Sequence, residues 1–163
     1  MALIAIADRP IVAGIGAIVV SDDPVAVLIA YGLGSCVALS GWDPGTRIGG
    51  LAHFMLPSGS APDPRAPAKF IEGGLEGFLA EFRRAGASVA RARFTVAGGA
   101  ATLTASASLG IGRRNVEALL AGLDRARIRV AAADTGGTGG RTVQLHVATG
   151  RLLVKSVSGS REL

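Results

Sequence analysis

A strong turn signal at residues 43–46 separates two apolar segments and predicts a β-hairpin in the first third of the chain. The segment reads Asp43-Pro44-Gly45-Thr46, with proline and glycine at positions where β-turns favour them. The flanking apolar segments have the character of strands. A hairpin centred on this turn makes Trp42 face Arg47 and Cys36 face His53.

This hairpin would place a thiol beside an imidazole. Cys36 is the single cysteine of the chain, and His53 is one of two histidines. Residues directly opposite in an antiparallel ladder hold their Cβ atoms roughly 4.5–5.5 Å apart, close enough for an imidazole to accept a thiol proton. The hairpin therefore predicts Cys36 as a nucleophile and His53 as its base.

A structural interpretation of the same two residues stays open. A lone cysteine in an apolar strand is most often an inert buried side chain, and a lone histidine is most often a satisfied structural one. The pairing depends on the register of the two strands, because a bulge at Gly49-Gly50 would turn His53 to the other face of the sheet.

Composition narrows the class of protein. At 163 residues the chain is long enough for one domain with a real core. A single cysteine excludes an internal disulfide framework, and we expect neither a metal nor a cofactor. The apolar segment 11–20 is too short to span a bilayer and lacks a signal-peptide pattern, so we expect a cytoplasmic protein that is not inserted in a membrane.

The net charge of +5 comes from scattered arginines. Arg83-Arg84 and Arg113-Arg114 lie near predicted helix ends, without the interleaved aromatic residues that a nucleic-acid platform needs. We interpret these pairs as solvated helix faces and expect no nucleic-acid binding. A docking surface for an acidic partner is the alternative.

The remaining segments predict a single α+β domain over residues 1–163. Apolar residues recur with helical spacing in segments 68–85 and 115–127. Further strands are predicted at 11–20, 25–30, 93–97, 128–133, 141–147 and 151–157. About seven strands and two long helices favour an antiparallel-rich sheet with helices packed outside. The proline-rich segment Ser58–Pro67 is predicted to be a mobile loop.

Three polar residues outside the hairpin are further candidates for a structural or functional role. Asn115 stands at a predicted helix start, where capping is the simplest interpretation. Asp134 precedes the glycine-rich loop 135–140, and Arg141 follows it, so the two could form an ion pair. Alternatively, this loop borders the site and Arg141 contacts the substrate.

Four motifs in this order resemble those of the CheD family of chemoreceptor glutamine deamidases. They are GLGSCV at 32–37, GGLAHFMLP at 49–57, IGRRN at 111–115 and DTGGTGGR at 134–141. The resemblance runs from about Val12 to Val157. It implies a β-sandwich core flanked by helices, similar to toxin-type cysteine deamidases. It also implies hydrolysis of the side-chain amide of selected glutamines on methyl-accepting chemotaxis receptors.

By this resemblance Cys36 is the nucleophile and His53 the base. The family typically carries a threonine five or six positions before the cysteine, where this chain has Ala30 and Tyr31. We expect the backbone carbonyl of Ala30 to hold the His53 ring in one tautomer, since only a fixed acceptor is needed. If the family instead uses the threonine hydroxyl, this site is impaired.

Substrate contacts are expected near the cysteine. The backbone N–H groups of Gly34, Ser35 and Cys36 are candidate donors to the oxyanion that forms on the substrate amide.

The resemblance also implies partners. The substrate would be the cytoplasmic domain of methyl-accepting chemotaxis receptors, and a CheC-type phosphatase would regulate binding. Two other functions stay open. One is a catalytically weak family member that acts as a binding regulator of receptors or of the phosphatase. The other is an ester hydrolase that acts on methylated receptor glutamates.

Overall fold

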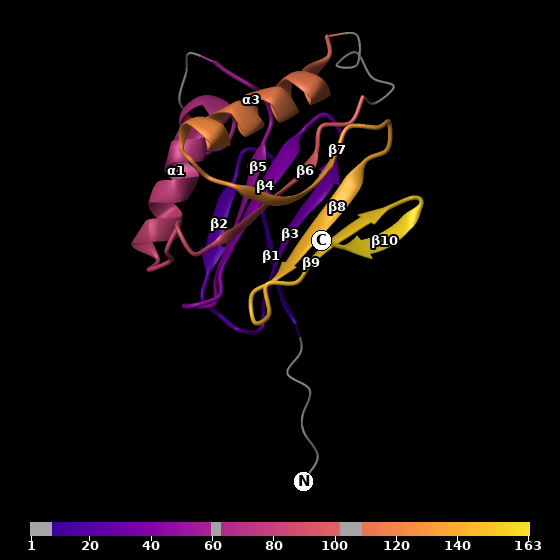
Figure 1. The fold of residues 1–163 in the computed structure, drawn as a ribbon. Coiled ribbons are helices and arrows are strands. Elements are labelled where there is room, and N and C mark those ends of the chain that lie inside the picture. The colour runs from indigo at the N-terminus through magenta and orange to yellow at the C-terminus, as the bar shows by residue number, and fades with distance from the viewer. Residues whose placement is uncertain (1–7, 60–62, 102–108) are drawn as a thin grey trace.

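A computed structural model describes residues 8–59, 63–101 and 109–163, which form two five-stranded sheets and two helices (Figure 1). The first sheet has the order β1 (Arg9–Val12), β3 (Ala26–Leu33), β8 (Arg141–His146), β9 (Leu152–Ser156) and β10 (Gly159–Glu162). The second has the order β2 (Ile18–Ser21), β5 (Ile48–Phe54), β4 (Val37–Asp43), β6 (Arg93–Gly98) and β7 (Val130–Thr135). The helices are α1 (Ile71–Arg84) and α3 (Ile111–Arg125).

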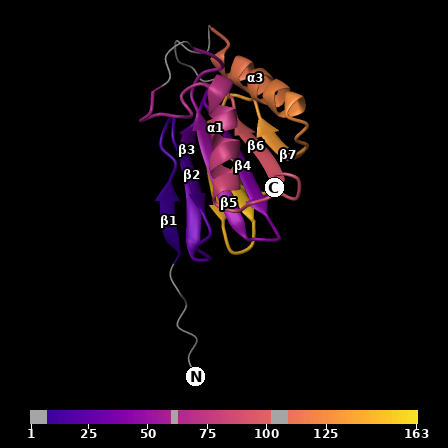
Figure 2. The same cartoon turned by 90° about the vertical axis from the view of Figure 1, so that its left-hand side faces the viewer.

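The elements stack in three layers, because the second sheet is buried on both faces. An inter-sheet cluster fills the space between the two sheets and includes Leu28, Ala38, Leu51, Ala97, Val143 and Leu145. A helix-facing cluster lies on the other side of the second sheet and includes Leu39, Phe54, Phe78, Phe82 and Leu119. Figure 2 shows α1 lying across this sheet. Most strand pairs are antiparallel, with β1–β3 and β6–β7 parallel. The predicted α+β sandwich flanked by helices is confirmed.

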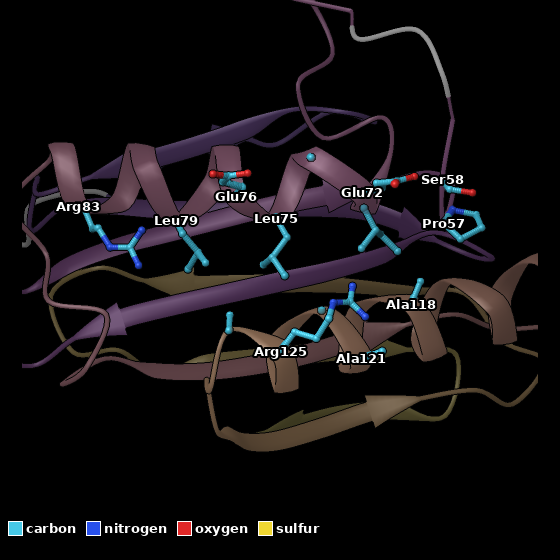
Figure 3. Close-up of a pocket in the computed structure, with 14 residues that line it drawn as sticks. Pro57, Ser58, Glu72, Leu75, Glu76, Leu79, Arg83, Ala118, Ala121 and Arg125 are labelled. Atoms are coloured by element: carbon cyan, nitrogen blue, oxygen red, sulfur yellow. The ribbon is translucent and has the colours of Figure 1, made fainter.

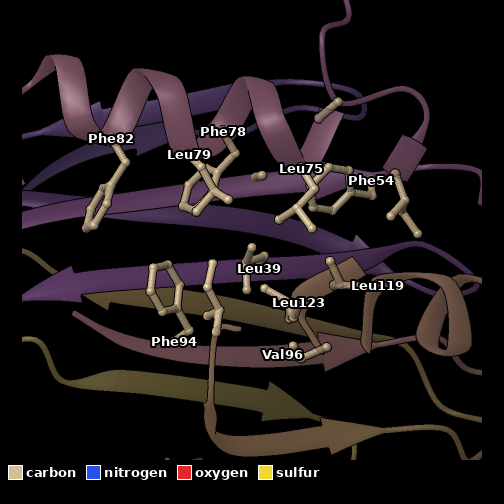
Figure 4. Packing of buried hydrophobic residues seen from close by; sticks show 14 of the residues in the cluster. Leu39, Phe54, Leu75, Phe78, Leu79, Phe82, Phe94, Val96, Leu119 and Leu123 are labelled. Atoms are coloured by element: carbon tan, nitrogen blue, oxygen red, sulfur yellow. The ribbon is translucent and has the colours of Figure 1, made fainter. Parts of the chain in front are cut away.

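Both helices turn an apolar stripe toward the second sheet. Phe78 and Phe82 of α1 and Leu119 and Leu123 of α3 lie in the helix-facing cluster (Figure 4). The two helices also border a pocket of about 680 Å³ between them (Figure 3). In the described part of the chain, neither helix is long and apolar enough to cross a membrane.

Helix boundaries differ from the predicted ones. Helix α1 begins at Ile71, not at residue 68, and its first turn is interrupted by non-helical backbone at Glu72 and Gly73. Helix α3 begins four residues before Asn115, after Gly110 in the left-handed conformation. The predicted loop 58–67 and the segment 98–110 are described in part, since residues 60–62 and 102–108 lie outside the described residues. The described parts of the loop hold turns at residues 64–65 and 67 and no helix or strand.

The predicted strand 11–20 is wrong, because this segment crosses from one sheet to the other. Strand β1 ends at Val12, and strand β2 begins at Ile18. Between them lies a turn in which the N–H of Ala17 donates to the carbonyl of Gly14. Gly16 has a φ of 80°, and a Cβ there would lie 2.8 Å from that of Ala66. A continuous apolar run cannot reveal such a break, since the residues on both sides of it lie in strands. The crossing passes beside His53.

The predicted hairpin forms between β4 and β5, but its register is different. Trp42 pairs with Gly49 rather than Arg47, and Ala38 pairs with His53. The loop spans residues 44–47 because the Asp43 carboxylate accepts hydrogen bonds from the Gly45 N–H and the Thr46 hydroxyl. A β-turn signal alone does not specify this side-chain-organised loop.

Asp43 also joins this loop to the segment after α1. Its fully buried carboxylate accepts two hydrogen bonds from Arg91, at 2.9 and 2.7 Å, and one from the Ser88 N–H. The Arg91 guanidinium, together with these N–H donors, holds the pKa of Asp43 well below its usual range.

We therefore expect Asp43→Ala to lower the free energy of unfolding by about 3 kcal/mol, because it leaves the donors of four residues, Arg91, Ser88, Gly45 and Thr46, without their acceptor. The lowered pKa means that the Asp43 contribution is complete above pH of about 4 and is lost as the pH falls further. Urea denaturation of wild type and Asp43→Ala at pH 7 and pH 3 measures both effects. A difference in stability that does not shrink at pH 3 would contradict this account.

Candidate active site

Cys36 lies in the short loop 34–36 between β3 and β4, at the end of the β4–β5 hairpin. Its half-buried side chain packs against the inter-sheet cluster, on the same side as Ala38. His53 is 1% exposed and pairs directly with Ala38, so its side chain points to that side too. Cys36 and His53 therefore share the inter-sheet face.

The two side chains are diagonal neighbours, and the predicted direct opposition is wrong. If the ladder continued past its last pair, Val37–Phe54, Cys36 would face Met55. The shift relative to the prediction is an even number of residues, so it preserves the face of each side chain. Diagonal neighbours in a ladder lie roughly 7–8 Å apart, which long side chains can span.

The His53 ring is held by a backbone carbonyl from the crossing segment. Its Nδ1 lies 3.1 Å from the Ala13 carbonyl oxygen. The His53 N–H donates to the Ala17 carbonyl, and the His53 carbonyl accepts from the Gly16 N–H. A carbonyl can only accept, so Nδ1 carries the proton and Nε2 presents a lone pair. Nε2 is buried and has no hydrogen-bond partner among the described residues.

The predicted acceptor for His53, the carbonyl of Ala30, is replaced by that of Ala13. Ala30 is fully buried in β3 and pairs with Val143 of β8 in the first sheet. The kind of acceptor was predicted correctly, but its position was not. A backbone carbonyl has no side-chain signature, and residue 13 lay in a segment predicted to be a continuous strand.

Burial keeps both groups neutral in the resting site. Desolvation lowers the pKa of His53, partly offset by the hydrogen bond to Ala13. Desolvation also raises the pKa of the Cys36 thiol. At neutral pH the site therefore holds a thiol and a neutral imidazole, whose Nε2 can accept a proton.

The lowered pKa of His53 predicts a pH-dependent stability. Below pH of about 6.5 an unfolded chain protonates this histidine while the folded chain resists it. We therefore expect the free energy of unfolding to decrease as the pH falls below about 6.5. Denaturation curves at pH 7.5 and 5.5 measure the slope, and His53→Gln should make it shallower. An unchanged slope in His53→Gln would assign the effect to other groups.

The loop that carries Cys36 is fixed through three successive carbonyls. The carbonyl of Gly34 accepts from the Ala100 N–H, that of Ser35 from Asn115 Nδ2 and that of Cys36 from the Gly99 N–H, each at 2.8 Å. These contacts hold the peptide groups of the loop in one orientation.

Two of the three predicted oxyanion donors are available. The Gly34 N–H already donates to the Gly32 carbonyl at 2.8 Å. The N–H groups of Ser35 and Cys36 donate to no acceptor within the described ranges. A contact between these two N–H groups and a substrate oxyanion stays a prediction.

Asn115 does not cap a helix, contrary to the prediction. It lies inside α3 and is fully buried. Its Nδ2 donates to the carbonyls of Ser35 and Met55. The IGRRN motif signalled that this position matters, but only the tertiary structure shows the contacts.

Arg141 forms the predicted ion pair with Asp134, with Nε and Oδ1 2.9 Å apart. Its other nitrogens donate to the carbonyls of Gly136 and Gly139, so the guanidinium organises its own loop. This loop is also linked to the end of β6, because the Gly136 N–H donates to the Gly98 carbonyl. The next residue, Gly99, donates its N–H to the Cys36 carbonyl. A substrate contact by Arg141 stays a prediction.

The pocket between α1 and α3 is separate from these groups. It is lined by residues such as Leu75, Leu79 and Gly122 and includes neither Cys36 nor His53 (Figure 3). It lies on the helical side of the second sheet, whereas His53 faces the first sheet. Across the described ranges, no group of three His, Cys, Asp or Glu side chains could hold a metal ion.

Comparison with known proteins points to one family. A family model described as CheD chemotactic sensory transduction matches residues 55–156. The probable chemoreceptor glutamine deamidase CheD of Symbiobacterium thermophilum is 46% identical over 92% of this chain and 94% of its own. The chemoreceptor glutamine deamidase CheD of Thermotoga maritima is 40% identical over 93% of this chain and 95% of its own.

A solved structure gives a weaker likeness. The crystal structure of Bacillus licheniformis hypothetical protein YfiH covers 49% of this chain and 26% of its own, with 21% identity and a TM-score of 0.33. A likeness this partial says nothing about function.

Proposed function

Since this chain belongs to the CheD family, we propose that it is a protein-glutamine deamidase that acts on methyl-accepting chemotaxis receptors. It converts selected glutamines to glutamate and releases ammonia. The observation that carries the proposal is the His53 ring, whose Nε2 is buried, unprotonated and on the same face as Cys36. The names of the relatives supply the substrate class.

The first step is formation of the nucleophile. The Cys36 thiol has a raised pKa, so it forms little thiolate at neutral pH without a base. His53 Nε2 accepts the thiol proton, and the Ala13 carbonyl stabilises the resulting imidazolium through Nδ1–H. The thiolate then attacks the carbon of the glutamine carboxamide, and the electron pair of the C=O bond moves to oxygen.

The second feature is stabilisation of the oxyanion. The N–H groups of Ser35 and Cys36 lie in a loop whose carbonyls are held elsewhere, so they need no reorganisation during the reaction. One such donor is typically worth about 3 kcal/mol of transition-state stabilisation.

The last steps return the enzyme to its resting state. The imidazolium of His53 donates its proton to the amide nitrogen, and ammonia leaves as the C–N bond breaks. Water, deprotonated by the same imidazole, attacks the thioester and releases glutamate and the Cys36 thiol. The proposed reaction needs no cofactor.

The proposed partner is the cytoplasmic domain of the receptors, which places the reaction in the cytoplasm. A CheC-type phosphatase is a proposed regulator. The test is incubation of the protein with receptor cytoplasmic fragments, followed by peptide mass spectrometry and ammonia measurement. We expect glutamate at selected glutamine positions, and no conversion with Cys36→Ala. Intact binding without conversion by wild type would contradict the proposal.

A second candidate is a binding regulator with weak turnover. It is favoured by Ala30, because this chain lacks a hydroxyl where the family typically has threonine. The same incubation separates the two candidates, since a regulator binds receptor or phosphatase without converting glutamine. Methylated receptor fragments, assayed in parallel, test for ester hydrolysis by the same thiol.

A further inference from the structure

The side chain of Asn115 joins the two chain segments that carry the proposed catalytic pair. Its Nδ2 lies 2.8 Å from the Ser35 carbonyl oxygen and 2.9 Å from the Met55 carbonyl oxygen. Ser35 directly precedes Cys36, and Met55 follows His53 by two residues. Both acceptors are carbonyls, so the amide nitrogen rather than the oxygen must face them.

This contact lies where the β4–β5 ladder ends. The last pair of the ladder is Val37–Phe54. Beyond it, Ser35 and Met55 are connected through the Asn115 amide instead of through each other. The relative position of the Cys36 loop and the end of β5 therefore depends on a side chain from a third element, α3.

Close packing holds α3 against the segment 99–100. A Cβ at Gly112 would lie 2.4 Å from the Ala100 carbonyl oxygen, and a Cβ at Gly99 would lie 2.3 Å from Val116 Cγ2. Segment 99–100 itself donates to the carbonyls of Cys36 and Gly34. Helix, segment and loop thus form one packed unit, which fixes the backbone that carries Asn115 relative to the Cys36 loop.

The amide is poorly suited to stability alone. Asn115 is fully buried, and its Oδ1 has no hydrogen-bond partner among the described residues. A buried polar atom without a partner is unfavourable and calls for an explanation. A bridge that fixes the site geometry supplies one.

We propose that Asn115 is a positioning residue that sets the distance and orientation between the Cys36 thiol and the His53 ring. This inference rests on the proposed function, because it assumes that these two groups react together. Small misplacements of reacting groups cost about 10²-fold in rate. We therefore expect Asn115→Ala to lower the deamidation rate by about that factor.

The test measures the reactivity of Cys36 directly, without a receptor. Cys36 is the only cysteine, so its alkylation by iodoacetamide between pH 5 and 10 reports how far His53 assists the thiol. For Asn115→Ala we expect slower alkylation at neutral pH and a profile that approaches that of His53→Ala. A purely structural role would leave the profile of the folded protein unchanged.

Ser40→Ala is the matched control. The Ser40 hydroxyl is buried and donates to the Thr95 carbonyl, so its removal also deletes a buried bond to a backbone oxygen, away from the Cys36 loop. We expect the wild-type alkylation profile for this variant. If Asn115→Ala does not fold, Asn115→Ser serves instead, since serine has a shorter side chain than asparagine but still carries one hydrogen-bond donor, its hydroxyl. It should give the same direction of change.

The outcomes separate this inference from the proposed function. If wild type converts glutamine and Cys36→Ala does not, while folded Asn115→Ala matches wild type in turnover and alkylation profile, the positioning role is overturned. If wild type does not convert glutamine, or Cys36→Ala still does, the proposed function itself fails. If the alkylation profile changes in Asn115→Ala but not in Ser40→Ala, the positioning role is supported.

Discussion

Cys36→Ala will show no receptor deamidation above the uncatalysed rate, and Cys36→Ser will be nearly as inactive. Alanine removes the nucleophile and with it the thioester route. Serine retains a hydroxyl, but its proton is far harder to remove than that of a thiol. Burial has already lowered the pKa of His53, so the imidazole is too weak a base for a hydroxyl. The measurement is ammonia release and glutamate formation on receptor fragments.

The controls for this prediction use the fact that the chain has one cysteine. One equivalent of iodoacetamide should inactivate wild type completely and label residue 36 alone. Both variants should fold and bind receptor fragments as wild type does, because the half-buried side chain makes no hydrogen bond in the described structure. Residual turnover by Cys36→Ala would show that the chemistry lies elsewhere.

The sequence was sufficient for the hairpin that carries this site, because the relevant information is local. The turn chemistry at residues 43–46 placed a reversal between two apolar strands, and pairing the strands about that turn put Cys36 and His53 on one face. The exact register was not predictable, since the Asp43 carboxylate organises a loop of the same length that begins one residue later, at residue 44. The even shift preserved the face, so the expected thiol–imidazole pairing remains geometrically feasible.

The supports of the site were not predictable, because they come from distant segments. The acceptor for His53 is a main-chain oxygen in a segment that changes sheets after Val12. The bridge at Asn115 depends on α3 packing against segment 99–100. Neither leaves a pattern of period or spacing. The family resemblance marked residues 111–115 without showing their contacts.

The last prediction concerns the base. His53→Gln should lower the deamidation rate by about 10²–10⁴-fold, the usual contribution of a general acid–base group. Glutamine can fill the site, but it neither accepts the thiol proton nor donates one to the leaving ammonia. Alkylation of Cys36 at neutral pH should slow in parallel, because the thiol has a raised pKa and no base is then left to remove its proton.

The pH profile distinguishes loss of the base from a general disturbance of the site. Wild-type activity should decline on the acid side only below pH of about 6.5, since the pKa of His53 is lowered from that value. The residual activity of His53→Gln should instead rise with pH as the Cys36 thiol ionises. His146→Gln is the matched control, because the other histidine pairs with Val27 at the opposite end of β3 from Cys36. If both variants kept the wild-type rate and profile, His53 would have no part in proton transfer.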